Sequence, residues 1–171
     1  MALITTALRG AQFLWTLLTM ALIGNMIARS FAGDPAIINY DMFVAVFSML
    51  SLLYLIPASI KDNLGSPIIT IALDVLNTLF YFCGAVATAA YLGARNCSNS
   101  DYTRSNFITN GEANTESRCR KAQASTTFMF FNFFLFAATA VLSAMHGRNE
   151  GVNLRGGIGG IRMGGPAMSQ V

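Results

Sequence analysis

The chain has 171 residues, of which 54% are hydrophobic and only 11% charged, and its mean hydropathy is +0.52. A soluble domain carries about 25% charged residues because its surface has to be hydrated. So few charges exclude a soluble globule of this size and indicate a protein that is embedded in lipid. The net charge of +3 is small and scattered between apolar segments, so it does not indicate a nucleic-acid partner.

Four apolar segments are long enough to cross a bilayer, for which a helix needs about 20 residues. Each is predicted to be helical, because backbone polar groups in lipid have to bond within their own segment. We therefore predict an all-α, four-helix membrane bundle over residues 1–147, followed by a flexible Gly-rich tail over residues 148–171, with both ends on one side. The predicted spans are residues 10–28, 41–60, 67–93 and 122–145.

The numbers of Lys and Arg on the two sides are nearly equal, so the positive-inside rule does not orient the chain. The cysteines are more informative. Cys97 and Cys119 lie in the polar loop 94–121, at the ends of two spans that we expect to be antiparallel neighbours. A disulfide between them would contribute about 3 kcal/mol and would persist only in an oxidising compartment. It predicts an extracellular loop and cytosolic termini; the alternative is two unrelated free thiols.

The third span carries polar residues at offsets of four, three and four, which places them on one face of the helix. Polar groups on the other three spans, Thr16 among them, fall at similar depths, and Arg9 could reach inward from the start of the first span. We interpret these side chains as an interhelical hydrogen-bond network, with each bond contributing about 0.6 to 2 kcal/mol. The predicted members are Thr70, Asp74, Asn77, Tyr81, Asn132, Tyr54 and Gln12.

The alternative interpretation of this polar stripe is a proton or ion site in a small channel or transporter. One acid, Asp74, is a narrow basis for a pathway, and no Lys, Arg or His lies deep in any predicted span. Under the hydrogen-bond interpretation, Asp74→Asn is expected to leave assembly largely intact. A loss of ion flux with normal folding would support transport.

Small residues repeat every four positions in three of the spans, a pattern that lets helices approach closely. We interpret it as packing within the bundle, with oligomerisation as the alternative. The fourth span is rich in Phe at most angular positions, so some of these rings face lipid or a neighbouring protein. The small positions are Gly24, Ala28, Ala85, Ala89, Gly93, Ala140 and Ala144.

The C-terminal tail carries Arg148, Arg155 and Arg162, which we expect to contact anionic lipid headgroups at about 1 kcal/mol each. Its Gly-rich run lacks the Gly-Lys-Ser/Thr ending of a phosphate-binding loop. The single histidine, His146, lies at a membrane edge and provides too little for a metal cluster or a His-based nucleophile. We therefore expect no catalytic site, no metal and no cofactor other than a bound lipid.

Several motifs resemble the MARVEL family of tetraspan proteins, and more closely its fungal non-classical export protein group. LRGAQF at residues 8–13 is similar to the family's Arg-x-x-Gln/Asn-Phe start of the first helix, and LDVLNTLF at residues 73–80 is similar to its third. The loop sequence over residues 97–124 and the closing SQV at residues 169–171 are also similar. The resemblance covers nearly the whole chain.

This resemblance implies a non-enzymatic organiser of the fungal plasma membrane, which builds or maintains a microdomain of lipid and protein. It implies association with the eisosome scaffold beneath the membrane and a response to sphingolipids. The expected partners are membrane lipids, a sphingolipid or sterol among them, other plasma-membrane proteins and further copies of the chain. A role in the export of proteins that lack signal peptides is another alternative.

Overall fold

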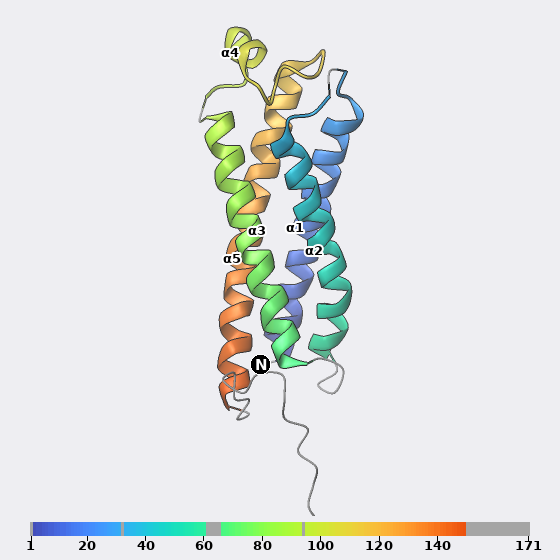
Figure 1. Ribbon diagram of the computed structural model, residues 1–171, viewed down its shortest axis with the longest axis vertical. Helices are drawn as coiled ribbons and strands as arrows, with labels where there is room; N and C mark the ends of the chain where they lie inside the picture. The colour runs from blue at the N-terminus through green and yellow to red at the C-terminus, as the bar shows by residue number, and fades with distance from the viewer. Residues whose placement is uncertain (1, 32, 61–65, 94, 150–171) are drawn as a thin grey trace, which may run out of the picture.

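The computed structural model describes residues 2–31, 33–60, 66–93 and 95–149 (Figure 1). Four long helices pack side by side, and each is long and apolar enough to cross a membrane. A short helix, α4 (Ser100–Ser105), lies at the end opposite to the start of α1 and the end of α5 (Figure 1). The described part of the chain is therefore the all-α, four-helix membrane bundle that the sequence predicts. The long helices are α1 (Ala2–Ala28), α2 (Ala36–Ile60), α3 (Pro67–Leu92) and α5 (Thr115–Asn149).

Two of the helices begin earlier in the chain than predicted. The sequence analysis placed Arg9 and Asp41 at membrane boundaries, yet α1 begins at Ala2 and α2 at Ala36. Arg9 and Asp41 are both buried, with an exposed fraction of only 1% each. The prediction was wrong at these two positions because it treated Arg9 and Asp41 as flanks of their spans, whereas a charged side chain can lie inside a bundle when other helices surround it.

The third helix has boundaries close to the predicted ones. Pro67 occupies its first turn, where the missing N–H would have had no helical partner. Gly93 ends it with a positive φ of 64°, and its N–H donates to the carbonyl of Ala89. An L side chain is strained at that φ, which explains why glycine stands there.

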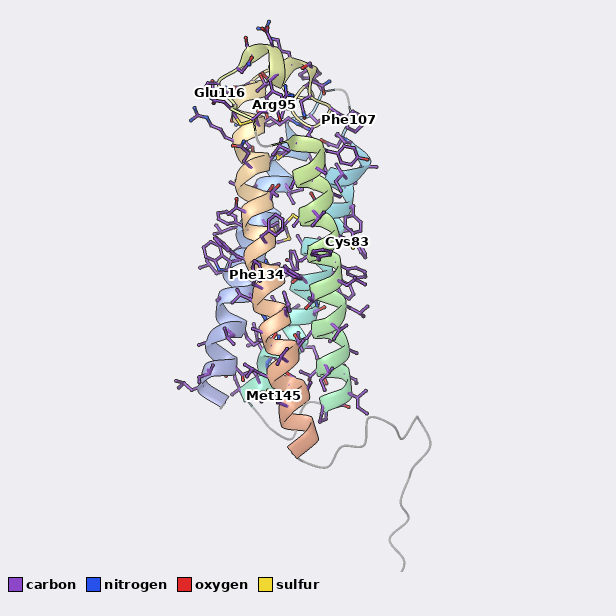
Figure 2. All side chains as sticks on the ribbon, turned by 90° about the vertical axis from the view of Figure 1, so that its left-hand side faces the viewer. Cys83, Arg95, Phe107, Glu116, Phe134 and Met145 are labelled. Atoms are coloured by element: carbon purple, nitrogen blue, oxygen red, sulfur yellow. A yellow bond between two sulfur atoms is a disulfide. The ribbon has the colours of Figure 1, made fainter. Side chains whose placement is uncertain are left out.

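Apolar side chains fill the bundle in two main clusters. The larger occupies the middle and includes Tyr81, Met129 and Phe136. The second lies at the α4 end, where Ile108 of the outer loop packs with residues of the helices and is fully buried. The remaining apolar surface points outward: Phe134 is 63% exposed, and it lies with Cys83 at mid-height on the flank of the bundle (Figure 2).

Other helices approach closely at Gly84, a position that the small-residue pattern did not include. A Cβ atom there would lie 2.5 Å from Cε of Met129 and 2.8 Å from Oδ1 of Asp41. Ala85 is fully buried beside it, in agreement with its predicted packing role. A Cβ at Gly24 or Gly93 would meet no atom within 4 Å, so these two predicted packing positions do not bring helices together.

Candidate functional site: a polar core within the bundle

A buried ion pair joins α1 to α3 in the half of the bundle that contains the start of α1. The Arg9 guanidinium donates through Nη1 to Oδ1 of Asp74 at 2.5 Å and through Nη2 to Oδ2 at 2.7 Å. Nη1 also donates to Gln12 at 3.0 Å and to Thr139 at 3.3 Å, and the Gln12 amide donates to Thr139 at 3.0 Å. The planar fork of arginine matches a carboxylate in this two-pronged arrangement. Three helices thus meet at one charged cluster.

Arg9 corrects the expectation that no basic residue lies deep in a span. Its side chain is 1% exposed, and Asp74 is completely buried. A signal for this position existed in the sequence, because Arg9, Gln12 and Thr16 share one face of α1 at offsets of three and four. The sequence analysis noted that Arg9 could reach inward, but it treated this residue as a boundary marker.

A second polar cluster lies further along the bundle and joins all four long helices. The Thr16 hydroxyl lies 3.1 Å from the Tyr81 hydroxyl and 3.3 Å from the Ser48 hydroxyl, and it accepts a hydrogen bond from the Asn132 amide at 3.2 Å. The Tyr81 ring stacks on Phe136 with centroids 5.8 Å apart. Each cluster member is fully buried, so these mutual hydrogen bonds replace part of those that water would provide, while Oδ1 of Asn132 has no partner among the described residues.

Three other predicted network members stand apart from the two clusters. Asn77 is fully buried, but its amide donates to the backbone carbonyl of Leu73. The Tyr54 hydroxyl accepts from the backbone N–H of Ser66 at 3.2 Å, at the α2–α3 turn. Thr70 is only half buried. Matching residues by their depth in the membrane placed Tyr54 too far inside, because it followed residue counts and ignored the direction of the side chain. The helical offsets did the same for Thr70, which lies near the start of α3.

Asp41 is a buried acid that the sequence analysis missed. Its Oδ2 accepts from the Thr88 hydroxyl at 2.6 Å, and the absence of a side chain at Gly84 leaves room for Oδ1. The signal was the spacing on α2, where Asp41 falls on the same face as the buried residues Ile38 and Ser48. An acid at the interface of α2 and α3 therefore exists in addition to Asp74.

Residues 95–114 form an outer cap on the bundle, and this cap is held by a fourth buried charged residue, Arg118 of α5. Its Nε donates to the carbonyl of Ile108 at 2.7 Å and its Nη1 to the carbonyl of Met26 at 3.0 Å. Its Nη2 donates to Asp34 at 2.6 Å, and the arginine side chain is fully buried. The guanidinium rests against Gly111, where a Cβ would lie 3.1 Å from Cζ. The Arg118 side chain thus connects the outer cap, through Ile108, to α1 at Met26 and to the α1–α2 connection at Asp34.

Cys97 and Cys119 form a disulfide, with Cα atoms 5.7 Å apart. Beside it, Tyr102 of α4 donates its hydroxyl to the carbonyl of Leu92 at the end of α3. Burial raises the pKa of the Tyr102 phenol above 10.0, and the nearby Arg95 guanidinium offsets part of that rise. The loop is therefore a folded cap rather than a freely projecting insert.

The side surface of the bundle, away from its core, carries an apolar groove of about 380 Å³ between α3 and α5. Phe82 and Phe133 stand at one end with ring centroids 5.3 Å apart. The Thr78 hydroxyl in the lining donates to the carbonyl of Asp74, so it is already bonded within its own helix. The lining residues are Val75, Thr78, Leu79, Phe82, Phe133, Ala137 and Ala140.

Some predicted positions lie outside the described residues. These are Arg155 and Arg162 and the side chain of Arg148, to which we assigned lipid-headgroup contacts. Within the described ranges, no group of three or more His, Cys, Asp or Glu side chains is arranged to hold a metal ion.

Four membrane-crossing helices around a buried polar core define a multi-pass tetraspan membrane protein. The MARVEL family model, described as a membrane-associating domain, matches residues 2–142, and the chain belongs to the MARVEL family. It is 36% identical to non-classical export protein 102 of Candida albicans over 165 residues, which are 96% of this chain and 95% of the relative.

Two relatives come from Saccharomyces cerevisiae. The chain is 31% identical to non-classical export protein 2 over 147 residues, or 85% of this chain and 83% of the relative. It is 31% identical to homolog 1 of that protein over 144 residues, or 84% and 78%. No solved structure matches the chain. The family and the names of the relatives point to a membrane protein without a catalytic role.

Proposed function

We propose that this protein is a non-enzymatic organiser of the plasma membrane, which maintains a microdomain of lipid and protein through contacts at the outer faces of its helices. The proposed microdomain is eisosome-associated and sphingolipid-responsive, as the family resemblance implies. The termini are cytoplasmic in this proposal. The Cys97–Cys119 disulfide supports that orientation, because it requires an oxidising compartment around the loop.

The observation that carries the proposal is the apolar groove between α3 and α5. Its lining combines the small residues Ala137 and Ala140 with the aromatic rings of Phe82 and Phe133. The only lining hydroxyl, that of Thr78, is bonded to its own helix, so recognition depends on shape rather than on a headgroup contact. We propose a sterol as the occupant, because a rigid apolar ring system loses little conformational entropy when it binds.

A photoreactive sterol tests this assignment on the full chain in lipid bilayers. Ala137→Phe fills the groove and is expected to reduce cross-linking to residues 75–82 and 133–140 at least tenfold. Ala138→Phe is the matched control, because Ala138 is exposed on the same helix and is not among the lining residues. Equal cross-linking in both variants would overturn the sterol site. Competition by a sphingolipid but not by unlabelled sterol would reassign it.

Imaging in fungal cells tests the organiser role. The tagged protein is expected in surface patches that reorganise when sphingolipid synthesis is blocked, and Ala137→Phe is expected to spread the signal. A diffuse surface signal that does not respond to sphingolipid depletion would contradict the proposal. Blue native electrophoresis in mild detergent tests the accompanying proposal of a homo-oligomer.

Two other functions have specific observations in their favour. The names of the relatives favour a role in the export of proteins that lack signal peptides. Secretion of such a cargo, measured in cells with and without the gene, tests that role. The buried polar core favours a small transporter. Proton or ion flux into vesicles that contain the purified protein, lost in an Asp74→Asn protein that thermal unfolding shows to be folded, would support transport over organisation.

A further inference from the structure

The described parts of the four long helices contain very few charged residues between their ends. Arg9 and Asp74 neutralise each other through two short hydrogen bonds. Asp41, on α2, is also charged by type and lies between the ends of its helix. No ion pair in the described part of the chain includes it. Two acids in one bundle therefore have opposite surroundings, since one faces a guanidinium and the other does not.

The surroundings of Asp41 come from three helices. Thr88 of α3 donates its hydroxyl to Oδ2 at 2.6 Å, and Oδ1 has no hydrogen-bond partner among the described residues. Oδ1 lies against the backbone of Gly84, close to the methyl group of Met129 on α5. The Asp41 side chain is 1% exposed, so water does not reach either oxygen from the surface.

The titratable groups near Asp41 do not supply a positive charge. Tyr40 precedes it on α2 and donates its hydroxyl to the carbonyl of Phe80 at 3.4 Å. Cys83 on α3 is a free thiol that faces outward. No Lys, Arg or His occurs in the described residues 10–28 of α1, 36–60 of α2, 67–92 of α3 or 122–145 of α5.

We infer that Asp41 is a proton-binding site, at which the carboxyl group is held as a neutral acid between α2 and α3. An isolated carboxylate in an apolar interior is far too costly for one hydroxyl to stabilise, so the group binds a proton instead. The Thr88 hydroxyl suits either form, because it both donates and accepts. Loss of the proton would leave an uncompensated charge against Gly84, so proton binding is coupled to the α2–α3 contact.

Infrared spectroscopy of the full chain in lipid bilayers at neutral pH tests this inference. A protonated carboxylic acid has a carbonyl stretch well separated from the carboxylate bands. The wild-type protein is expected to show this acid band, and Asp41→Asn is expected to lose it while keeping the fold. The matched control is the double replacement of Arg9 and Asp74 by Leu, which removes the paired carboxylate together with its guanidinium and is expected to leave the acid band in place. An acid band that is absent from the wild type, or that persists in Asp41→Asn, would overturn the inference.

Thr88→Val keeps the test decisive if Asp41→Asn does not fold. This variant retains the carboxyl group and removes its hydrogen-bond donor. The acid band is then expected to keep its intensity and to shift to higher frequency, because a free acid carbonyl is stiffer than a bonded one. A band that does not move in Thr88→Val would show that it belongs to another acid. This outcome is independent of the proposed sterol groove, whose lining contains neither residue.

Discussion

Arg9 and Asp74, which lie 65 positions apart in the chain, form a two-pronged ion pair in the interior of the bundle, with nitrogen–oxygen distances of 2.5 and 2.7 Å. Both side chains are almost completely removed from solvent. The pair stabilises only in its complete form, because either partner alone would be an uncompensated buried charge. It also connects the first helix to the third, so it contributes to the choice of neighbours within the bundle.

Breaking this ion pair is the first test. Arg9→Leu and Asp74→Asn are each expected to lower the free energy of unfolding by about 3 to 5 kcal/mol, measured by thermal unfolding in mild detergent. The double replacement of both residues by Leu is expected to recover most of that loss. The structure thus reverses the sequence-based expectation that Asp74→Asn leaves assembly largely intact, because Arg9 would remain buried without its partner.

Arg29→Leu is the control for this prediction. Arg29 is 63% exposed and lies 3.7 Å from Glu112, so its removal is expected to cost about 0 to 1 kcal/mol. Wild-type stability in either single variant at Arg9 or Asp74 would contradict the assigned role of the pair.

Adding one methyl group at Gly84 is expected to destabilise the bundle. Gly84→Ala would place Cβ 2.5 Å from Met129 and 2.8 Å from Asp41, an overpacking that typically costs about 1 to 3 kcal/mol. Gly24→Ala is the control, because a Cβ there meets nothing within 4 Å, and alanine favours a helix by up to about 1 kcal/mol. Thermal unfolding should rank Gly24→Ala above Gly84→Ala, and the opposite order would refute the packing interpretation.

Arg118→Lys is expected to loosen the outer cap while the spans stay folded. Lysine keeps the charge but cannot reach Ile108, Met26 and Asp34 together, so we expect a loss of about 2 to 3 kcal/mol. Hydrogen exchange should rise in residues 95–114 and stay low in the middle of the helices. The control is Arg120→Lys, because Arg120 is 67% exposed and its pair with Glu116 contributes only a few tenths of a kcal/mol. Unchanged exchange in the cap of Arg118→Lys would contradict its role.

Removing the disulfide is expected to destabilise the loop region by about 3 kcal/mol in the chain-entropy model. The variant is Cys97→Ser with Cys119→Ser, and Cys83→Ser is the control because that thiol is free and exposed. Mass spectrometry without reduction should find the two loop peptides joined in protein isolated from cells. Two free thiols would disprove the bridge and remove the main support for cytoplasmic termini.

The cap is expected to lose stability in alkali through Tyr102. Burial raises the pKa of this phenol in the folded protein above 10.0, so its contribution is fully present below pH 10.0 and is lost as the pH rises through the folded-state pKa. The phenolate has no proton to donate to the carbonyl of Leu92. Protection of the cap from hydrogen exchange, taken relative to the base-catalysed exchange rate of an unstructured chain at the same pH, should fall above pH 10.0 in the wild type. In Tyr102→Phe, exchange should be faster at neutral pH, and protection should lack the alkaline step at this position; the same step in both proteins would exclude Tyr102 as its source.

Segment hydropathy predicted the four long helices and their approximate ends, because hydrocarbon accepts only long, internally bonded apolar helices. The offsets of four, three and four placed Asp74, Asn77 and Tyr81 on a buried face, and all three are completely buried. The buried stripe did not extend to Thr70, which is half buried. Matching by depth failed for Tyr54, because depth along a helix does not determine which neighbour a side chain meets.

By itself, the sequence determined a four-span membrane bundle, its family and the two cysteines that flank its longest loop, since these follow from local composition, spacing and motifs. Only the tertiary structure decided that Arg9 and Asp41 lie inside the bundle rather than at its edges. Whether a charge is tolerated in a bundle depends on the groups that other helices bring to it, and those groups lie far away in the chain. Arg9 is paired with Asp74, whereas the Thr88 hydroxyl is the one hydrogen-bond partner of the Asp41 side chain among the described residues. This difference separates an ion pair from a proposed proton-binding site.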